Sequence, residues 1–163
     1  MNKALPADPA DLVHGPLLRW AREHPDRPAI IQDAHGSHAR QLDFGQLLAA
    51  VKERGAAPTG RPLGNNVLLT STADPLALLI DFLAVIRTGR CAAVADPDWP
   101  TEVHARMEAA LRDMGDQSPA PNPPPTPETP FYIGFTSGST GLPKGFRRDH
   151  RSWVETFRIT LQD

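Results

Sequence analysis

A single lysine stands in a run of small and hydroxyl-bearing residues near the end of the chain. Residues 136–145 read TSGSTGLPKG and follow the apolar stretch FYIGF. Loops that bind phosphate need glycines, because backbone amides must approach the anion without a side chain in the way. They also need hydroxyl groups and one flexible cation, such as an ammonium group. The run therefore points to the binding of a phosphate group.

Each residue type in the run has its own task in this hypothesis. Hydroxyls, open backbone positions and the cation come from Thr136, Ser137, Gly138, Ser139, Thr140, Gly141, Lys144 and Gly145. The run is not a Walker loop, because Lys144 precedes Gly145 and Phe146 instead of a Ser or Thr. A GxGxxG dinucleotide fingerprint is also missing. From composition alone, a flexible turn that joins two strands is an equal alternative.

Short apolar strands and helices alternate in the segments before the run. Strands are expected at VLLT (67–70), CAAVA (91–95) and FYIGFT (131–136), and helices at 75–88 and 101–114. This rhythm is typical of a parallel sheet with helices packed on it. We therefore expect an α/β fold with a mostly parallel sheet, in which VLLT and CAAVA are parallel neighbours.

The N-terminal third is expected to hold two more helices and a hairpin. PLLRWAREHP predicts a helix, and AIIQD and ARQLD predict two strands around the turn AHGSH. Asp43 is expected to cap a helix whose buried face carries Phe44, Leu47, Leu48 and Val51. Glycines and prolines between residues 55 and 64 break the pattern.

The C-terminal half is expected to divide at a proline-rich linker. Thr101 is predicted to cap a helix with one apolar face, formed by Val103, Met107, Ala110, Leu111 and Met114. Residues 118–130 carry seven prolines, so we predict an α/β subdomain at 1–117, a linker at 118–130, and a strand, loop and helix at 131–163. The last helix is predicted to start with a capping box of Ser152 and Glu155. Its apolar stripe is formed by Trp153, Phe157 and Leu161.

Composition excludes several classes of protein. Seventeen Lys and Arg against nineteen Asp and Glu give a formal charge of −2, which argues against a general nucleic-acid binder. One cysteine cannot form an internal disulfide, which favours a reducing, cytoplasmic setting. The longest apolar run, PLALLIDFLAVI, is too short to span a bilayer. We therefore expect a soluble protein with no membrane span and no nucleic-acid partner.

Other reactive side chains have plainer interpretations. His35 and His38 lie in the expected hairpin turn without a third ligand, so no metal site is predicted. Asp96 and Asp98 in DPDWP are better explained by a turn than by acid–base work. Cys91 lies in an apolar strand and is expected to be inert.

The phosphate loop also resembles that of a known family. TSGSTGLPKG matches, over ten consecutive positions, the loop Thr-Ser-Gly-Ser/Thr-Thr-Gly-x-Pro-Lys-Gly of the adenylate-forming (AMP-binding) superfamily. That superfamily contains acyl- and aryl-CoA synthetases, adenylation domains of nonribosomal peptide synthetases, and luciferases. REHPDRPAII, QLDFGQLLAAV and LAVIRTGRCAAVADPDWP resemble further segments of the family in the same order.

The resemblance implies an AMP-forming ligase. In the family the loop binds the β- and γ-phosphates of ATP, accompanied by Mg²⁺, while a carboxylate attacks the α-phosphate. The acyl group then passes to the thiol of coenzyme A or of a carrier protein. Thr136, Ser137, Ser139 and Thr140 would hold phosphate oxygens, and Lys144 would act in catalysis by neutralising the leaving pyrophosphate. His150 matches a histidine often found after the loop in the family, and no catalytic role is assigned to it.

The family's later parts, including the acyl pocket and the C-terminal domain with its catalytic lysine, are not found after Lys144. We therefore expect the N-terminal portion of an acyl- or aryl-CoA synthetase, catalytically incomplete by itself. An adenylation domain of a peptide synthetase and a non-catalytic phosphate-binding or assembly module are the alternatives. Apolar surface left uncovered would favour docking on the downstream part of the enzyme or dimer formation.

Overall fold

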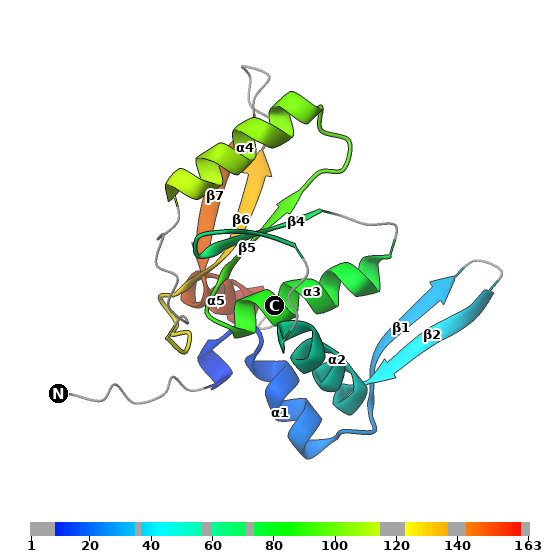
Figure 1. Ribbon diagram of the computed structural model, residues 1–163. Coiled ribbons are helices and arrows are strands. Elements are labelled where there is room, and N and C mark those ends of the chain that lie inside the picture. The colour runs from blue at the N-terminus through cyan, green and yellow to red at the C-terminus, as the bar shows by residue number, and fades with distance from the viewer. Residues whose placement is uncertain are drawn as a thin grey trace.

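The centre of the molecule is a five-stranded mixed sheet (Figure 1). The computed structural model describes residues 9–34, 37–56, 60–70, 74–114, 123–136 and 143–160. In spatial order the strands are β3 (Arg61–Leu63), β4 (Asn66–Thr70), β5 (Cys91–Ala95), β6 (Pro130–Thr136) and β7 (Lys144–Asp149). β4, β5 and β6 are parallel, whereas β3 and β7 run antiparallel to their neighbours.

The parallel pairing of VLLT with CAAVA is confirmed, because Val67 lies opposite Ala92 in the ladder. The two antiparallel strands, β3 and β7, were not predicted, and they lie at the edges of the sheet. Pro62 does not prevent β3 from forming, because β3 lies at the edge of the sheet, where a missing backbone donor is tolerated.

Helices α3 (Pro75–Arg87) and α4 (Thr101–Met114) cover opposite faces of this sheet. Successive side chains of a strand point to opposite faces. Leu68 and Ala93 therefore pack with Leu111 of α4, while Val67 packs on the other face with Ile86 of α3.

Both ends of α3 follow the expected chemistry. The Asp74 side chain accepts hydrogen bonds from the backbone amides of Leu76 and Ala77 at the start of the helix. After the helix, Gly89 adopts a φ of 74°, a conformation that favours glycine.

For α4 the prediction was partly wrong. Met107 and Leu111 are buried, but Ala110 and Met114 are exposed. Thr101 is the first helical residue, and the carbonyl of Pro100 accepts the first helical hydrogen bonds.

The N-terminal third packs on the α3 side as a smaller unit. Helices α1 (Gly15–Glu23) and α2 (Phe44–Ala56) share an apolar cluster with α3. Strands β1 (Pro28–Ala34) and β2 (Ser37–Asp43) form a separate antiparallel hairpin that projects from the body (Figure 1). The turn is shorter than expected, because Ala34 and Ser37 are already paired. Asp43 and Gln46 cap α2 reciprocally, with hydrogen bonds of 2.6 and 3.1 Å.

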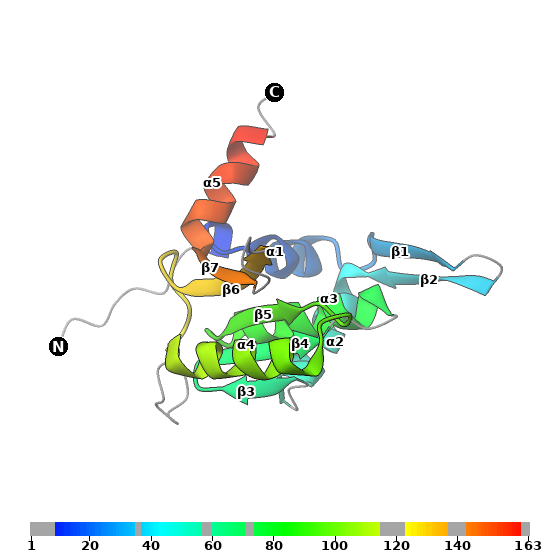
Figure 2. The ribbon, with the colours of Figure 1, turned by 90° about the horizontal axis from the view of Figure 1, so that it is seen from above.

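A short 3₁₀ helix, η1 (Pro9–Asp11), contacts α5 (His150–Thr160), which stands off from the sheet in Figure 2. The predicted capping box of α5 was wrong. The cap is Asp149, whose Oδ1 accepts a hydrogen bond of 2.8 Å from the Ser152 amide. Trp153 is half-buried against the α3 face of the sheet, whereas Phe157 is 49 % exposed. Leu161 lies outside the described residues. No described helix is long and apolar enough to cross a membrane.

Candidate functional site

The two ends of the phosphate loop are held side by side by a β-hairpin. β6 ends at Thr136 and β7 begins at Lys144, and these two residues are direct partners in the ladder. The Thr136 hydroxyl donates a hydrogen bond of 3.4 Å to the Lys144 carbonyl. The structure thus brings together Thr136, Lys144 and Gly145. The predicted phosphate ligands Ser137, Gly138, Ser139, Thr140 and Gly141 lie outside the described residues.

The side chains at the mouth of the loop are accessible. Thr136 and Lys144 are both exposed, so a hydroxyl group and an ammonium group can reach a ligand from adjacent strands. A side chain at Gly145 would meet only ordinary contacts, with Phe135 Cε1 at 3.6 Å and Ile133 Cγ2 at 3.7 Å. Packing by the described residues therefore does not require a glycine there, which leaves access to the backbone as its use.

A second glycine in the hairpin is required by packing, and the sequence did not single it out. Gly134 is paired with Phe146, whose ring lies over it. A Cβ at Gly134 would come within 2.4 Å of Phe146 Cζ. The same ring contacts Tyr132 edge-on at 6.1 Å between centroids. Phe146 therefore ties the middle of β7 to β6 although it is itself 40 % exposed.

Two of the arginines that follow Lys144, Arg147 and Arg151, make structural contacts. Arg147 donates a 2.9 Å hydrogen bond to the carbonyl of Met114, the last residue of α4. Arg151 forms an ion pair with Glu128 in the segment that leads into β6. These contacts favour a structural role for Arg147 and Arg151 over a direct role at a triphosphate.

A buried histidine closes the other end of the hairpin. His150 has no exposed surface, and its Nδ1 accepts a hydrogen bond of 3.2 Å from the Val13 amide. Its ring stacks on Phe131 with centroids 4.8 Å apart and planes at 15°. The ring of His14 meets it edge-on at 5.6 Å.

Both imidazoles are held in the neutral form. Burial and, to a smaller extent, the neighbouring His14 lower the pKa of His150 to about 4, while Asp149 opposes the shift. Burial and the charge of Arg87 lower the pKa of His14 to about 4. A neutral ring keeps the lone pair with which His150 Nδ1 accepts the Val13 hydrogen bond. Sequence reasoning gave His150 no role, and its burial depends on contacts that no local pattern encodes.

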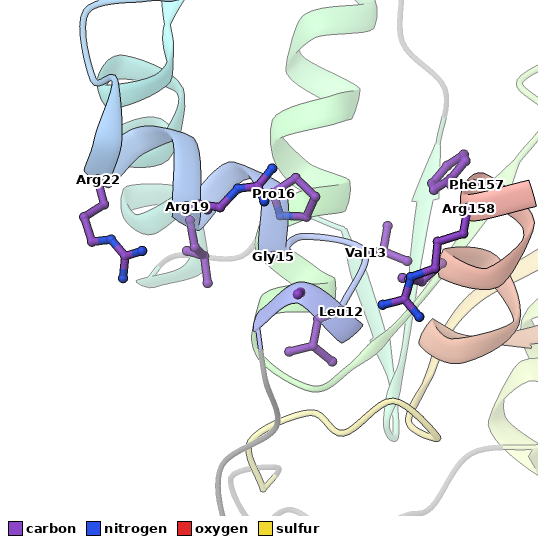
Figure 3. Close-up of a pocket in the computed structure, with 11 residues that line it drawn as sticks. Leu12, Val13, Gly15, Pro16, Arg19, Arg22, Phe157 and Arg158 are labelled. Atoms are coloured by element: carbon purple, nitrogen blue, oxygen red, sulfur yellow. The ribbon is translucent and has the colours of Figure 1, made fainter. Parts of the chain in front are cut away.

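An apolar groove of about 520 Å³ lies between α1 and α5 (Figure 3). Its walls include Leu12, Val13, Pro16, Val154, Phe157 and Arg158. The described lining of this groove contains no residue of the β6–β7 hairpin or of the phosphate loop. It is therefore a different surface from the mouth of the loop.

The other reactive residues, Asp96, Asp98 and Cys91, have structural roles. Asp96 Oδ1 accepts a 2.9 Å hydrogen bond from the Asp98 amide, as in a turn. Burial raises the pKa of the Cys91 thiol to about 12, which makes a thiolate inaccessible at neutral pH. Among the described residues there is no group of three or more His, Cys, Asp or Glu side chains that could hold a metal ion.

Comparison with known proteins gives a family match and several relatives. The model of the AMP-binding enzyme family matches residues 64–162. The chain is 49 % identical over 156 residues to YhfT of Bacillus subtilis, which is named as an uncharacterized acyl-CoA ligase. This alignment covers 94 % of this chain and 30 % of that protein. It is 27 % identical to tyrocidine synthase 2 of Brevibacillus parabrevis over 94 % of this chain and 5 % of that protein.

Solved structures share the fold. IdnL1 aligns with a TM-score of 0.70 and 19 % identity, over 93 % of this chain and 36 % of that one. A variant of Escherichia coli MenE with OSB-AMS bound aligns with a TM-score of 0.68 and 21 % identity, over 90 % of this chain and 36 % of that one. The expected fold is confirmed. The chain spans about a third or less of the length of these relatives.

Proposed function

Because the chain belongs to the AMP-binding enzyme family, we propose that it serves an ATP-dependent, AMP-forming ligase of the acyl- or aryl-CoA synthetase type. The observation that carries this proposal is the pairing of Thr136 with Lys144, which sets a hydroxyl and an ammonium group at the mouth of the loop. In this proposal residues 136–145 bind the β- and γ-phosphates of ATP. The 49 % identity to a named acyl-CoA ligase supports the choice of ligase.

In the proposed reaction, the role of this chain is to neutralise negative charge on the phosphates. A carboxylate oxygen forms a bond to the α-phosphorus, and the bond from that phosphorus to the bridging oxygen of the β-phosphate breaks. The products are an acyl-adenylate and pyrophosphate. Negative charge grows on the departing pyrophosphate, and the exposed Lys144 ammonium is placed to offset it.

Mg²⁺ enters the proposal together with ATP. The exposed Thr136 hydroxyl fits it, because this ion prefers oxygen ligands and usually keeps phosphate oxygens and waters in its shell. When bound, Mg²⁺ would neutralise phosphate charge.

The thiol that accepts the acyl group stays open between coenzyme A and a carrier protein. The relative named tyrocidine synthase 2 supports a peptide-synthetase adenylation domain as the second candidate. The higher identity to the acyl-CoA ligase favours the first candidate.

Apolar surface remains uncovered on α5 and beside it. We propose that the apolar groove and the exposed side chains Phe157 and Ile159 are covered by the further polypeptide that the longer relatives possess, or by a second copy of the chain. A cytoplasmic location and the division at a linker of residues 118–130 belong to the same proposal.

The test is carboxylate-dependent exchange of labelled pyrophosphate into ATP, in the protein that carries this chain. Lys144→Ala should slow the exchange by about 10²–10³-fold, the effect typical of removing one transition-state charge partner. Lys52→Ala is the matched control, because Lys52 is an exposed lysine of α2. Equal exchange rates in the two variants would contradict the assignment of the loop.

A binding measurement complements the exchange assay. The chain of residues 1–163 should bind tripolyphosphate with a dissociation constant of roughly 1 mM, which corresponds to about 4 kcal/mol. A few charge-assisted hydrogen bonds provide this energy after the cost of ordering the loop. Lys144→Ala should weaken this binding, and Lys52→Ala should not.

A further inference from the structure

β7 carries Lys144, yet most of the strand buries no side chain. All five residues from Lys144 to Arg148 are exposed, and β6 is its one neighbour in the described sheet. Register is strongly specified where a strand buries one face, and weakly specified where it does not. A slip of one residue would separate Lys144 from Thr136 and would turn its side chain to the other face. The register of β7 therefore needs anchors of another kind.

Anchors are visible in the middle of the strand and at its base. In the middle, the Phe146 ring lies over Gly134, and Arg147 donates a hydrogen bond to the Met114 carbonyl of α4. At the base, Asp149 pairs with Pro130, and the His150 amide donates a 3.3 Å hydrogen bond to the Thr129 carbonyl. The ladder is irregular between Pro130 and Tyr132, so regular pairing alone does not fix the base.

The His150 side chain holds the base from two sides. The ring stacks on Phe131, the second residue of β6, and so ties the end of β7 to the start of its partner. On the other side, Nδ1 accepts the amide hydrogen of Val13, which belongs to the segment between η1 and α1. Burial of the His150 ring makes the hydrogen bond from Val13 costly to lose, because a hydrogen-bonding group removed from water is destabilising when it is left unpaired.

We propose that His150 is a positioning residue for the phosphate loop: its buried ring fixes the base of the β6–β7 hairpin and, with it, the register that places Lys144 opposite Thr136. The effect on phosphate binding rests on the function proposed above. The effect on register does not.

Substitutions at this one position separate the two constraints. His150→Phe keeps a ring for the stack on Phe131 but removes the acceptor for the Val13 amide. His150→Asn and His150→Gln form a matched pair, because the Asn oxygen reaches the place of Nδ1 and the Gln oxygen reaches the place of Nε2, which has no described partner. Val51→Ala is the control for general destabilisation, since Val51 is fully buried in the cluster around α2, away from the hairpin.

The first readout is amide hydrogen exchange of residues 144–149, compared with residues 91–95 of β5 in the same molecule. His150→Gln loses both the stack on Phe131 and the acceptor for Val13, so it should speed exchange in β7 at least tenfold relative to β5. His150→Phe and His150→Asn each keep one of these contacts and should speed the exchange less. Val51→Ala should leave the ratio unchanged. If the His150 variants change the ratio no more than Val51→Ala does, the anchoring role is wrong. Should His150→Phe fail to fold, the comparison of Asn with Gln still decides the question.

The second readout is the dissociation constant for tripolyphosphate. It should rise about tenfold in His150→Gln, rise less in His150→Asn, and stay within twofold of the original value in Val51→Ala. If the original chain binds tripolyphosphate and His150→Gln binds it equally well, the positioning role is wrong. An original chain that does not bind tripolyphosphate at all would instead overturn the proposed function, and the exchange measurement would still decide whether His150 sets the register.

Discussion

Lowering the pH from 7.5 to 5 should destabilise the fold through the pair of buried histidines. His14 is 4 % exposed and His150 is fully buried, and burial lowers the pKa of each ring from 6.5 to about 4. The unfolded chain takes up protons below about pH 6.5, whereas the folded chain resists until about pH 4. The contribution of the pair is therefore fully present above pH 6.5 and is lost as the pH falls towards 4.

The size of the loss follows from the same pKa values. At pH 5 an unfolded imidazole is almost fully protonated and a buried one is mostly neutral. This difference lowers the free energy of unfolding by about 2 kcal/mol for one ring. The two rings together then cost about 4 kcal/mol. Since domains of this size are stable by about 5–15 kcal/mol, the loss is large enough to shift a denaturation midpoint clearly.

Urea unfolding at several pH values between 7.5 and 5 measures this loss. The carboxyl groups of Asp74 and Asp149 do not interfere, because their hydrogen bonds hold the pKa of each below its ordinary value of 3.8. The stability that these carboxyl groups contribute is lost only below the chosen window. A double variant with His14→Leu and His150→Phe should show little pH dependence in this window.

Two results would refute the reasoning. A midpoint that is equal at pH 7.5 and pH 5 would mean that the rings are not held neutral by burial. An equal loss in the double variant would mean that other groups are responsible.

Two further substitutions test the packing of the sheet. Asn66→Leu removes a buried 2.7 Å hydrogen bond from Nδ2 to the Leu111 carbonyl in the last turn of α4, and should lower the free energy of unfolding by about 1–3 kcal/mol; urea denaturation measures it, and a loss below about 0.5 kcal/mol would show that the carbonyl finds another partner. Gly60→Ala should cost about 1–3 kcal/mol, because Gly60 has a φ of 102° and a Cβ would lie 2.8 Å from Leu69 Cδ2; an unchanged thermal midpoint would contradict this.

Local chemistry made much of the fold predictable. Asp43 and Asp74 are side-chain caps that lie immediately before helices, and the structure places a helix start at both. The strands VLLT, CAAVA and FYIGFT are apolar because they are central in the sheet, so their composition identified them. The match of the loop to a family motif supplied the hypothesis about ATP, which spacing alone left open.

What escaped prediction depends on partners far along the chain. β7 reads KGFRRD, and its exposed residues carry no alternation by which a strand is recognised; β6 makes it a strand by pairing with it. The cap of α5 is Asp149 and not the predicted Ser152. The reason is that β7 ends at Asp149, which fixes where the helix begins. His150 was matched to a family histidine without a catalytic role, and its burial depends on distant partners such as the amide of Val13 and the ring of Phe131.

The hydrogen bond between Val13 and His150 also orders events during synthesis. The two residues are 137 positions apart, and Asp11 and Arg158, which form an ion pair nearby, are 147 apart. At the usual pace of translation, roughly ten seconds separate the appearance of such partners. Helices α1, α2 and α3, whose contacts are nearer in sequence, can pack within that interval. The segment around Val13 lacks this hydrogen bond and the ion pair of Asp11 until α5 has left the ribosome, even where the Val13 side chain packs on the sheet. A nascent chain stalled before residue 150 should therefore leave this segment open to chaperones and proteases, and release of the last helix should close it.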